Sequence, residues 1–224
     1  MFTSKLDTFC VICKGASLTR LPEIADRFND CFIVNNIDKD KTGSQEDGNE
    51  SEYTMIRDTI KGKNIVHFVN RLANVPLTEA HYKELGVKDV QFIKSHCDDK
   101  LIALAQIYKG MGIRTHLLPD CLLQYNQWFG VEYEHKHPNT GVLAVTYAAH
   151  IIQPRYLYVI GLDFYESDYT FRRPWQSPLV KQQKKMKDND IKGAVLHLIK
   201  RHPDIIFRMI TDAKMPKLDN LEVL

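Results

Sequence analysis

Short, nearly continuous apolar runs alternate along this chain with longer stretches in which apolar residues recur every three or four positions. The first pattern is typical of strands buried on both faces of a parallel sheet, and the second is typical of helices that cover such a sheet. We predict strands at Phe9–Cys13, Cys31–Val34, Ile65–Val69, Val90–Ile93, Thr115–Leu118, Tyr156–Ile160 and Ile205–Ile210. We predict helices at Leu18–Phe28, Tyr53–Ile60, Thr78–Leu85, Lys100–Gly110, Gly141–Ile152 and Ile191–Arg201. This alternation predicts an α/β fold with a Rossmann-like, mostly parallel sheet and helices on both faces.

Two stretches of the chain break the alternation. Residues 38–52 are polar and acidic without periodicity, which predicts a mobile surface loop. Residues 166–189 are first aromatic and then basic, and they are long for a plain connection, which favours a lid. We therefore divide the chain into one α/β domain, residues 1–163 and 190–224, and a lid segment, residues 164–189.

Length, composition and charge limit the class of protein. A chain of 224 residues with 44% hydrophobic residues can form one α/β domain with a full core. The formal net charge is +2, so overall charge gives no reason to expect a nucleic-acid partner. The chain lacks an apolar run of the ~20 residues that span a membrane. Its first residues also lack the pattern of a signal peptide, so we expect a cytoplasmic protein.

The five cysteines predict neither a disulfide framework nor a metal site, because their number is odd and their spacing irregular. Cys10 and Cys13 form a CxxC motif in a predicted strand, where residues three apart point to opposite faces, so we interpret both as small core residues. Asp38 and Asp40 resemble the DxD motif that holds a divalent ion in many sugar-nucleotide transferases, but they lie at the start of the acidic loop. We predict no metal cofactor.

The first candidate binding residues lie in a turn that opens a helix. Residues 14–18, with the sequence KGASL, follow the first predicted strand. Gly15 permits close approach of the backbone to a ligand, and Ser17 can cap the next helix. The turn matches neither GxGxxG nor a P-loop. Taken alone, it is better interpreted as a simple helix cap.

A second turn of this kind, residues 138–141 with the sequence PNTG, opens the helix before the sixth strand. That strand ends in glycine and aspartate at the same edge of the predicted sheet. Helix N-termini and the carboxyl ends of parallel strands bind anionic ligands, so two such turns on one sheet suggest a nucleotide site. The candidate binding residues here are Asn139, Thr140, Gly141, Gly161 and Asp163.

Asparagines end two further strands. Asn35 and Asn36 follow the second predicted strand, and Asn70 follows the third. An amide can read a sugar hydroxyl or a base edge with both a donor and an acceptor. Asparagine is also common in turns for purely structural reasons. Of these residues we select Asn36 and Asn70 as candidate ligand contacts.

Residues around the predicted lid add candidate catalytic groups. Tyr165 and Tyr169 follow the Gly161 strand, where their phenols can donate to a phosphate without adding charge or can pack at the base of the lid. His137 lies just before the second turn and can face the same cleft. A basic run in the lid is either a solvated face or a contact for an anionic glycan or membrane headgroup. Its lysines are Lys181, Lys184, Lys185 and Lys187.

Taken together, these motifs resemble the sialyltransferases, above all the bacterial family 42 of the glycosyltransferases. Those enzymes transfer sialic acid from CMP-sialic acid to a galactose or sialic acid on a lipooligosaccharide. Residues 15–18 are similar to the family's Gly-Pro-Ser-Leu turn, and residues 161–165 are similar to its Gly-Ile-Asp-Phe-Tyr. Residues 138–141 look like its Ser-Gly helix start and like the Pro-Ser-Thr-Gly of animal sialyltransferases, and residues 190–192 look like its Asp-Ile-Lys.

The resemblance implies a GT-A-variant fold and an inverting, metal-independent transfer of sialic acid or a related sugar from a CMP-activated donor to a glycan hydroxyl. By the resemblance, Asn36, Asn70 and Thr140 hold the CMP-sugar, and Tyr165 and Tyr169 hydrogen-bond the leaving phosphate. The sugar would pass through an oxocarbenium-like state, so the leaving group must be neutralised and the acceptor hydroxyl deprotonated. The family also implies a homo-oligomer and a peripheral membrane contact, with which the basic run is compatible.

Three departures from the family pattern leave the catalytic base open. Lys14 replaces an asparagine of the first turn, His137 replaces an arginine, and Lys185 holds the position of the general-base histidine. A lysine acts as a base near neutral pH only where burial or nearby cations lower its pKa, so His137 is the other candidate. Two further interpretations remain: a catalytically impaired relative that binds nucleotide or glycan, and another α/β nucleotide-dependent enzyme such as a pyrophosphokinase-like protein.

Overall fold

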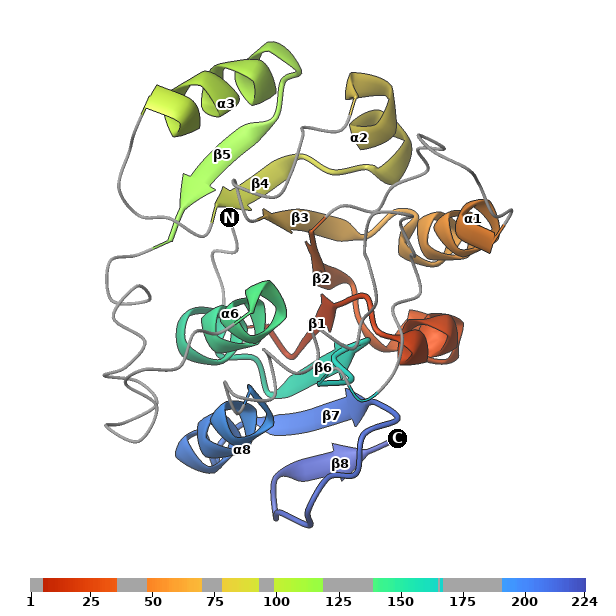
Figure 1. Ribbon diagram of the computed structural model, residues 1–224, viewed down its shortest axis with the longest axis vertical. Coiled ribbons are helices and arrows are strands. Elements are labelled where there is room, and N and C mark those ends of the chain that lie inside the picture. Colours follow the sequence, from red (N-terminus) through yellow and green to blue (C-terminus); the bar gives the residue numbers. More distant parts are fainter. Residues whose placement is uncertain are drawn as a thin grey trace.

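The computed structural model describes residues 6–35, 48–69, 78–92, 99–118, 139–164, 166 and 191–224. Its centre is an eight-stranded sheet with the strand order β5-β4-β3-β2-β1-β6-β7-β8, in which every neighbouring pair is parallel (Figure 1). The strands are β1 (Thr8–Ile12), β2 (Asp30–Val34), β3 (Asn64–Val69), β4 (Asp89–Phe92), β5 (Arg114–Leu117), β6 (Tyr156–Ile160), β7 (Ile206–Ile210) and β8 (Leu221–Val223). The predicted mostly parallel α/β fold is confirmed.

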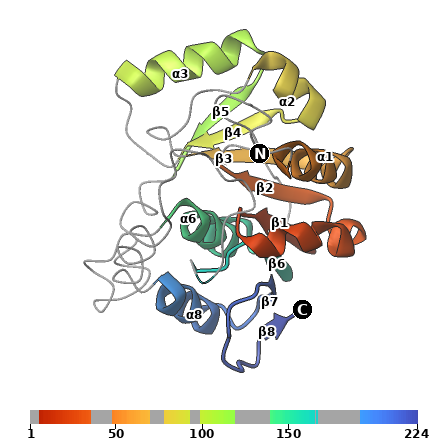
Figure 2. The same cartoon turned by 45° about the vertical axis from the view of Figure 1, so that its right-hand side comes forward.

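Helices cover both faces of the sheet, as Figure 2 shows from the side. One face carries η1 (Ala16–Arg27), α1 (Gly48–Ile60), α2 (Glu79–Leu85) and α3 (Asp99–Gly110). The other face carries α6 (Thr140–Tyr147), η3 (Ala148–Ile152) and α8 (Ile191–Arg201). Parallel strands are joined by right-handed crossovers. The chain therefore changes face when it returns from β5 to β6 and begins to add strands in the opposite direction.

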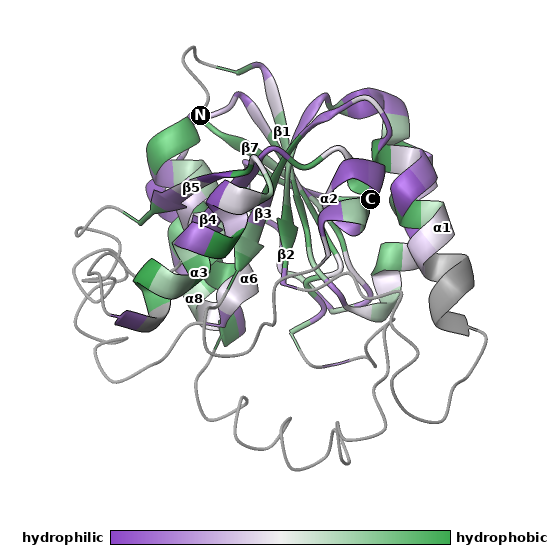
Figure 3. Ribbon diagram, turned by 90° about the horizontal axis from the view of Figure 1, so that it is seen from above, coloured by the Kyte–Doolittle hydropathy of each residue, from purple (hydrophilic) through white to green (hydrophobic). Residues whose placement is uncertain are grey.

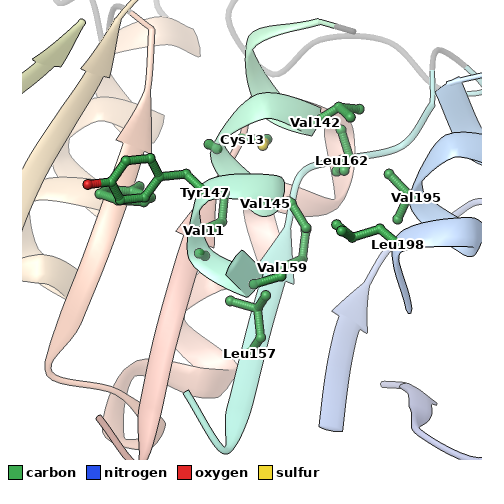
Figure 4. Close-up of a cluster of buried hydrophobic side chains, with 14 of the residues drawn as sticks. Val11, Cys13, Val142, Val145, Tyr147, Leu157, Val159, Leu162, Val195 and Leu198 are labelled. Atoms are coloured by element: carbon green, nitrogen blue, oxygen red, sulfur yellow. The ribbon is translucent and has the colours of Figure 1, made fainter. Parts of the chain in front are cut away.

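Alternation of side chains along each strand divides the interior into two hydrophobic clusters. On β1, Phe9 and Val11 face α6 and α8, whereas Cys10 and Ile12 face η1 and α1. Figure 4 shows the first cluster, in which Val145 of α6 lies over the sheet beside Val11 and Val159. Figure 3 shows the hydropathy along the ribbon, with mainly apolar strands in the middle and mixed apolar and polar residues on the surrounding helices. Cys13 joins the cluster opposite to that of Cys10, which confirms that the two thiols point to opposite faces.

The structure corrects the sequence analysis at three elements. α1 begins at Gly48, inside the predicted loop 38–52, because its first turn is polar and the buried apolar side chains start only at Tyr53. The first helix, η1, is a 3-10 helix with Pro22 inside, and the Lys63 ammonium donates to carbonyl oxygens at its end. β8 is a short, mostly exposed edge strand whose alternation gives too little signal to be predicted.

The long helix predicted before the sixth strand is present, and its last turn has an unusual geometry. α6 continues into η3, a π-helix that ends where Gln153 adopts the left-handed conformation with φ 52°.

Within the part of the chain that the structure describes, no helix combines the length and apolar character needed to cross a membrane.

Candidate functional site

The order of strands changes direction between β1 and β6. The chain leaves β1 towards β2 through η1, and it leaves β6 towards β7 on the opposite face. In parallel α/β sheets, the two loops diverge at such a point and leave a crevice at the carboxyl ends of the strands, where ligands bind. Gly15 follows β1, and Ser17 lies in the first turn of η1. The loop after β6 contains Gly161 and Asp163, so the structure brings these four predicted site residues together.

Ser17 and Asp163 brace the two loops against each other. The Ser17 backbone N–H donates to Asp163 Oδ2 at 3.0 Å, and the Ser17 hydroxyl donates to Asp163 Oδ1 at 2.6 Å. The Gly161 N–H donates to the Ser17 oxygen at 3.2 Å, and the Thr211 hydroxyl donates to Asp163 Oδ1 at 3.0 Å. Ser17 and Asp163 are 2% and 3% exposed. We call this set of contacts the Ser17–Asp163 brace; it uses both carboxylate oxygens within the protein.

The glycines of the two loops are required by close packing. The Gly15 N–H donates to the Gly161 carbonyl at 2.7 Å. A Cβ atom on Gly15 would overlap the Asp163 carboxylate, and it would lie 2.8 Å from the Gly161 carbonyl oxygen. Gly161 has φ +72°, in the left-handed region that favours glycine, and a Cβ there would lie 2.6 Å from the Cys13 carbonyl oxygen. Both glycines therefore let the loops touch.

The N-terminus of α6 packs onto the same two loops. Asn139 is its N-cap residue, and the Asn139 Oδ1 atom accepts from the Val142 N–H at 2.8 Å. A Cβ atom on Gly141 would lie 3.0 Å from Cys13 Sγ and 3.2 Å from Leu162, so only a glycine fits this position without a shift. Thr140 is 8% exposed. The positive end of α6 thus lies beside the crevice, where it favours an anion.

Asn35, at the carboxyl end of β2, presents a buried hydrogen-bond acceptor. Its backbone has φ 61°, and its N–H donates to the Phe68 carbonyl at 2.8 Å. The Asn35 Oδ1 atom is buried without a hydrogen-bond partner among the residues that the structure describes. A buried acceptor left without a donor costs ~1–3 kcal/mol, and such atoms in native proteins commonly mark a function. Asn36, the neighbouring residue selected from the sequence, lies outside the described residues and stays a prediction. Both asparagines follow the strand, and the burial of the Asn35 amide oxygen becomes visible only in the structure.

Lys14 contributes positive charge at the same edge. This half-buried residue follows Cys13, whose N–H donates to the Ile160 carbonyl at 2.8 Å. Burial and the Asp163 carboxylate raise the pKa of the Cys13 thiol to about 12, and Lys14 acts in the opposite direction. Burial lowers the pKa of the His67 imidazole on β3 to about 4, and the Lys14 charge adds to that lowering. The ammonium group therefore lies within electrostatic reach of both side chains.

Six predicted site residues lie outside the described part of the chain. They are Asn36, Asn70, His137, Tyr165, Tyr169 and Lys185. Their roles, the position of Asp38 and Asp40, and the lid beyond its first residues stay predictions. Phe164, the first residue assigned to the lid, is buried in the cluster under α6, and Glu166 accepts from the Lys192 ammonium at 3.0 Å. Within the described ranges, no three His, Cys, Asp or Glu side chains form a group that could hold a metal ion.

The geometry defines a doubly wound α/β protein with a ligand crevice at its topological switch point. No family model matches the sequence, and no curated protein matches it. A solved structure with the same fold is that of the sialyltransferase CstII from Campylobacter jejuni in complex with a substrate analogue, cytidine-5'-monophosphate. The TM-score is 0.55 at 20% sequence identity, and the match covers 93% of this chain and 82% of that chain. At this level of identity, the similarity establishes the fold.

Proposed function

We propose that this chain is a glycosyltransferase that moves sialic acid or a related sugar from a CMP-activated donor to a glycan hydroxyl. The observation that carries the proposal is the Ser17–Asp163 brace. It joins, across 146 residues, two of the sequence motifs that resemble sialyltransferases, and it does so at the switch point of a fold shared with a sialyltransferase solved in complex with CMP. Each motif alone is weak support for a sialyltransferase-like function, and their contact in space makes the support stronger.

The described groups at the crevice suit the two halves of a nucleotide. The Asn35 Oδ1 atom can only accept, so its partner on the ligand must be a donor such as a ribose hydroxyl or the cytosine amino group. A phosphate only accepts at neutral pH, and it suits the Lys14 ammonium and the N-terminus of α6. A cytidine phosphate offers both kinds of group.

In the proposed reaction, the bond between the anomeric carbon and the phosphate oxygen breaks, and CMP leaves with the electron pair. The acceptor hydroxyl oxygen attacks the opposite face of the sugar, which inverts the anomeric configuration, and its proton passes to a base. Tyr165 and Tyr169 donate hydrogen bonds to the departing phosphate, and His137 or Lys185 takes the proton. We propose that no metal ion takes part.

Calorimetric titration with CMP, UMP, GDP and ATP in the presence of EDTA tests the binding half of the proposal. We expect CMP to bind preferentially, and we expect Asn35→Ala to weaken its binding about tenfold, as the loss of one buried hydrogen bond predicts. Asn64→Ala is the matched control, since Asn64 is an exposed asparagine at the start of β3. Equal binding of all four nucleotides would contradict the proposal.

A donor-hydrolysis and transfer assay with CMP-sialic acid tests the chemistry. We expect turnover without added metal, and lower kcat in Tyr165→Phe. Loss of activity in His137→Ala but not in Lys185→Ala would assign the base to His137, and the reverse would assign it to Lys185. CMP binding without turnover would instead indicate the catalytically impaired relative, and preference for ATP would indicate the pyrophosphokinase-like alternative.

A further inference from the structure

A line of three hydrogen bonds, two of them fully buried, runs behind Asn35. His67 Nε2 lies 2.8 Å from the Asn35 carbonyl oxygen, and His67 Nδ1 lies 3.0 Å from the Tyr82 hydroxyl. The Tyr82 hydroxyl lies 3.1 Å from the Tyr108 hydroxyl. His67, Tyr82 and Tyr108 are only 3%, 1% and 2% exposed. The line therefore connects α3 and α2, through β3, to the end of β2 at the crevice.

The direction of each hydrogen bond of His67 follows from the chemistry of the groups. The Asn35 carbonyl can only accept, so His67 Nε2 carries a hydrogen and donates. Burial, reinforced by the Lys14 charge and opposed by the Asn35 carbonyl, lowers the pKa of His67 to about 4, so the imidazole is neutral at pH 7. In a neutral imidazole the other nitrogen accepts, so the Tyr82 hydroxyl is the donor to Nδ1. The Tyr82 oxygen also lies within hydrogen-bond distance of the Tyr108 hydroxyl, at 3.1 Å.

The last hydrogen bond of this line reaches the carbonyl of Asn35, whose backbone conformation has to be held by its surroundings. A residue other than glycine at φ 61° adopts a sparsely populated conformation, and such residues persist where the surroundings hold them. Two hydrogen bonds hold Asn35 here: its N–H donates to the Phe68 carbonyl, and its own carbonyl accepts from His67. The side chain that they orient carries the buried Oδ1 atom, which has no hydrogen-bond partner in the described part of the chain.

We propose that His67 is a positioning residue that keeps Asn35 in its left-handed conformation, so that the amide oxygen of Asn35 meets the ligand. Tyr82 and Tyr108 support the imidazole from behind. The inference rests on the proposed function, because it takes the ligand to be a cytidine nucleotide at the switch-point crevice. It assigns a ligand-binding role to side chains that lie in the core and do not themselves contact the nucleotide.

A double-mutant cycle on CMP affinity tests the inference, since coupling between two residues appears as non-additivity. His67→Leu removes the donor to Asn35, and we expect it to weaken CMP binding about tenfold, the value of a single lost hydrogen bond. In the Asn35→Ala background, the same His67→Leu substitution is expected to cause no further loss. His67→Gln places an amide nitrogen near the position of Nε2 and is expected to restore most of the affinity. Tyr82→Phe is a milder second variant for the case in which His67→Leu fails to fold.

The outcomes separate this inference from the proposed function. An equal loss of affinity from His67→Leu in both backgrounds would mean that His67 acts only on stability, and it would overturn the inference. Wild-type affinity in a folded His67→Leu or Tyr82→Phe protein, together with weakened binding in Asn35→Ala, would overturn the inference and leave the proposed function intact. A wild-type protein that does not bind CMP would overturn both.

Discussion

Ser17 donates two hydrogen bonds to the carboxylate of Asp163, from its backbone N–H at 3.0 Å and from its hydroxyl at 2.6 Å. One residue follows β1 and the other follows β6, so the contact closes the base of the crevice where the strand order reverses. Because Asp163 is 3% exposed, its oxygens depend on these donors and on Thr211 in place of water. The two residues were expected to touch a ligand, and the contacts seen here show them holding the loops.

We expect Ser17→Ala to lower the free energy of unfolding by about 1–3 kcal/mol, because it leaves a buried carboxylate oxygen with one donor fewer. Urea denaturation followed by circular dichroism measures the change. Thr19→Ala is the matched control, since the Thr19 hydroxyl makes an exposed contact with the Ala16 carbonyl, and its substitution should be nearly neutral. Equal stability of Ser17→Ala and wild type would show that the brace does not contribute to folding.

Gly15→Ala should be more damaging than a glycine substitution in an open position. The added methyl would overlap the Asp163 carboxylate and would force the two loops apart, at a cost of ~1–3 kcal/mol for overpacking. Gly110→Ala adds a methyl at the end of α3 with no atom within 4 Å, so it should be neutral or slightly stabilising. Thermal unfolding of the two variants gives the comparison. A smaller loss at Gly15 than at Gly110 is incompatible with the packing described here.

Acidification should destabilise the protein below about pH 6.5, the ordinary pKa of histidine. Burial lowers the pKa of His67 to about 4, so the unfolded chain takes up a proton before the folded protein does. The stabilising contribution is complete above the unfolded value and is lost as the pH falls towards the folded one. For His67 this amounts to about 2 kcal/mol between pH 7 and pH 5. Urea denaturation at both pH values should show this loss, and His67→Gln should reduce it; an unchanged pH dependence in that variant would refute the assignment.

Lys14→Asn should weaken the binding of CMP about tenfold, the scale of one charge-assisted hydrogen bond, and should leave cytidine binding unchanged. The reason is that the ammonium group acts on the phosphate, which cytidine lacks. Calorimetric titration with both ligands separates the two effects. Lys109→Asn, at an exposed lysine of α3, controls for the change in net charge. An equal loss for CMP and cytidine would place Lys14 away from the phosphate.

The three buried thiols should resist alkylation until the protein unfolds. Burial raises the pKa values of Cys13 and Cys31 to about 12 and raises that of Cys10 well above its ordinary value, so thiolate is scarce at neutral pH. A protein with Cys97→Ser and Cys121→Ser keeps only these three cysteines. Mass spectrometry after iodoacetamide treatment should find all three unmodified in buffer and modified in urea. Rapid modification of Cys10 or Cys13 in buffer would show that the CxxC motif is reactive.

The sheet was predictable because its inner strands are buried on both faces. Runs such as Val11-Ile12 and Phe32-Ile33-Val34 have no polar alternation, and all seven predicted strands occur within one residue of the expected bounds. β8 was missed because an edge strand exposed on one side needs little apolar sequence. The start of α1 at Gly48 was missed because a polar first turn leaves no apolar periodicity to detect.

The candidate site was only partly predictable. Glycine after a strand indicates close approach, and Gly15 and Gly161 do lie against each other. The sequence cannot show that both carboxylate oxygens of Asp163 accept hydrogen bonds from a serine 146 residues away, since that depends on the order of strands in the sheet. The line from Tyr108 to Asn35 was equally invisible, because its members are far apart along the chain and each is an ordinary residue in its own element.

The position of β1 in the middle of the sheet has a consequence for how the protein is made. β1 pairs with β2 on one side and with β6 on the other, where Thr8 lies opposite Tyr156. The second pairing can form only after Tyr156 has been synthesised. During synthesis, the first five strands can assemble one half of the sheet, and the inner side of β1 remains an open, apolar edge until most of the chain has left the ribosome. Pairings between such distant segments form slowly. The junction of β1 with β6, which shapes the crevice, therefore closes late in synthesis, and until then the open edge of β1 exposes the nascent protein to aggregation.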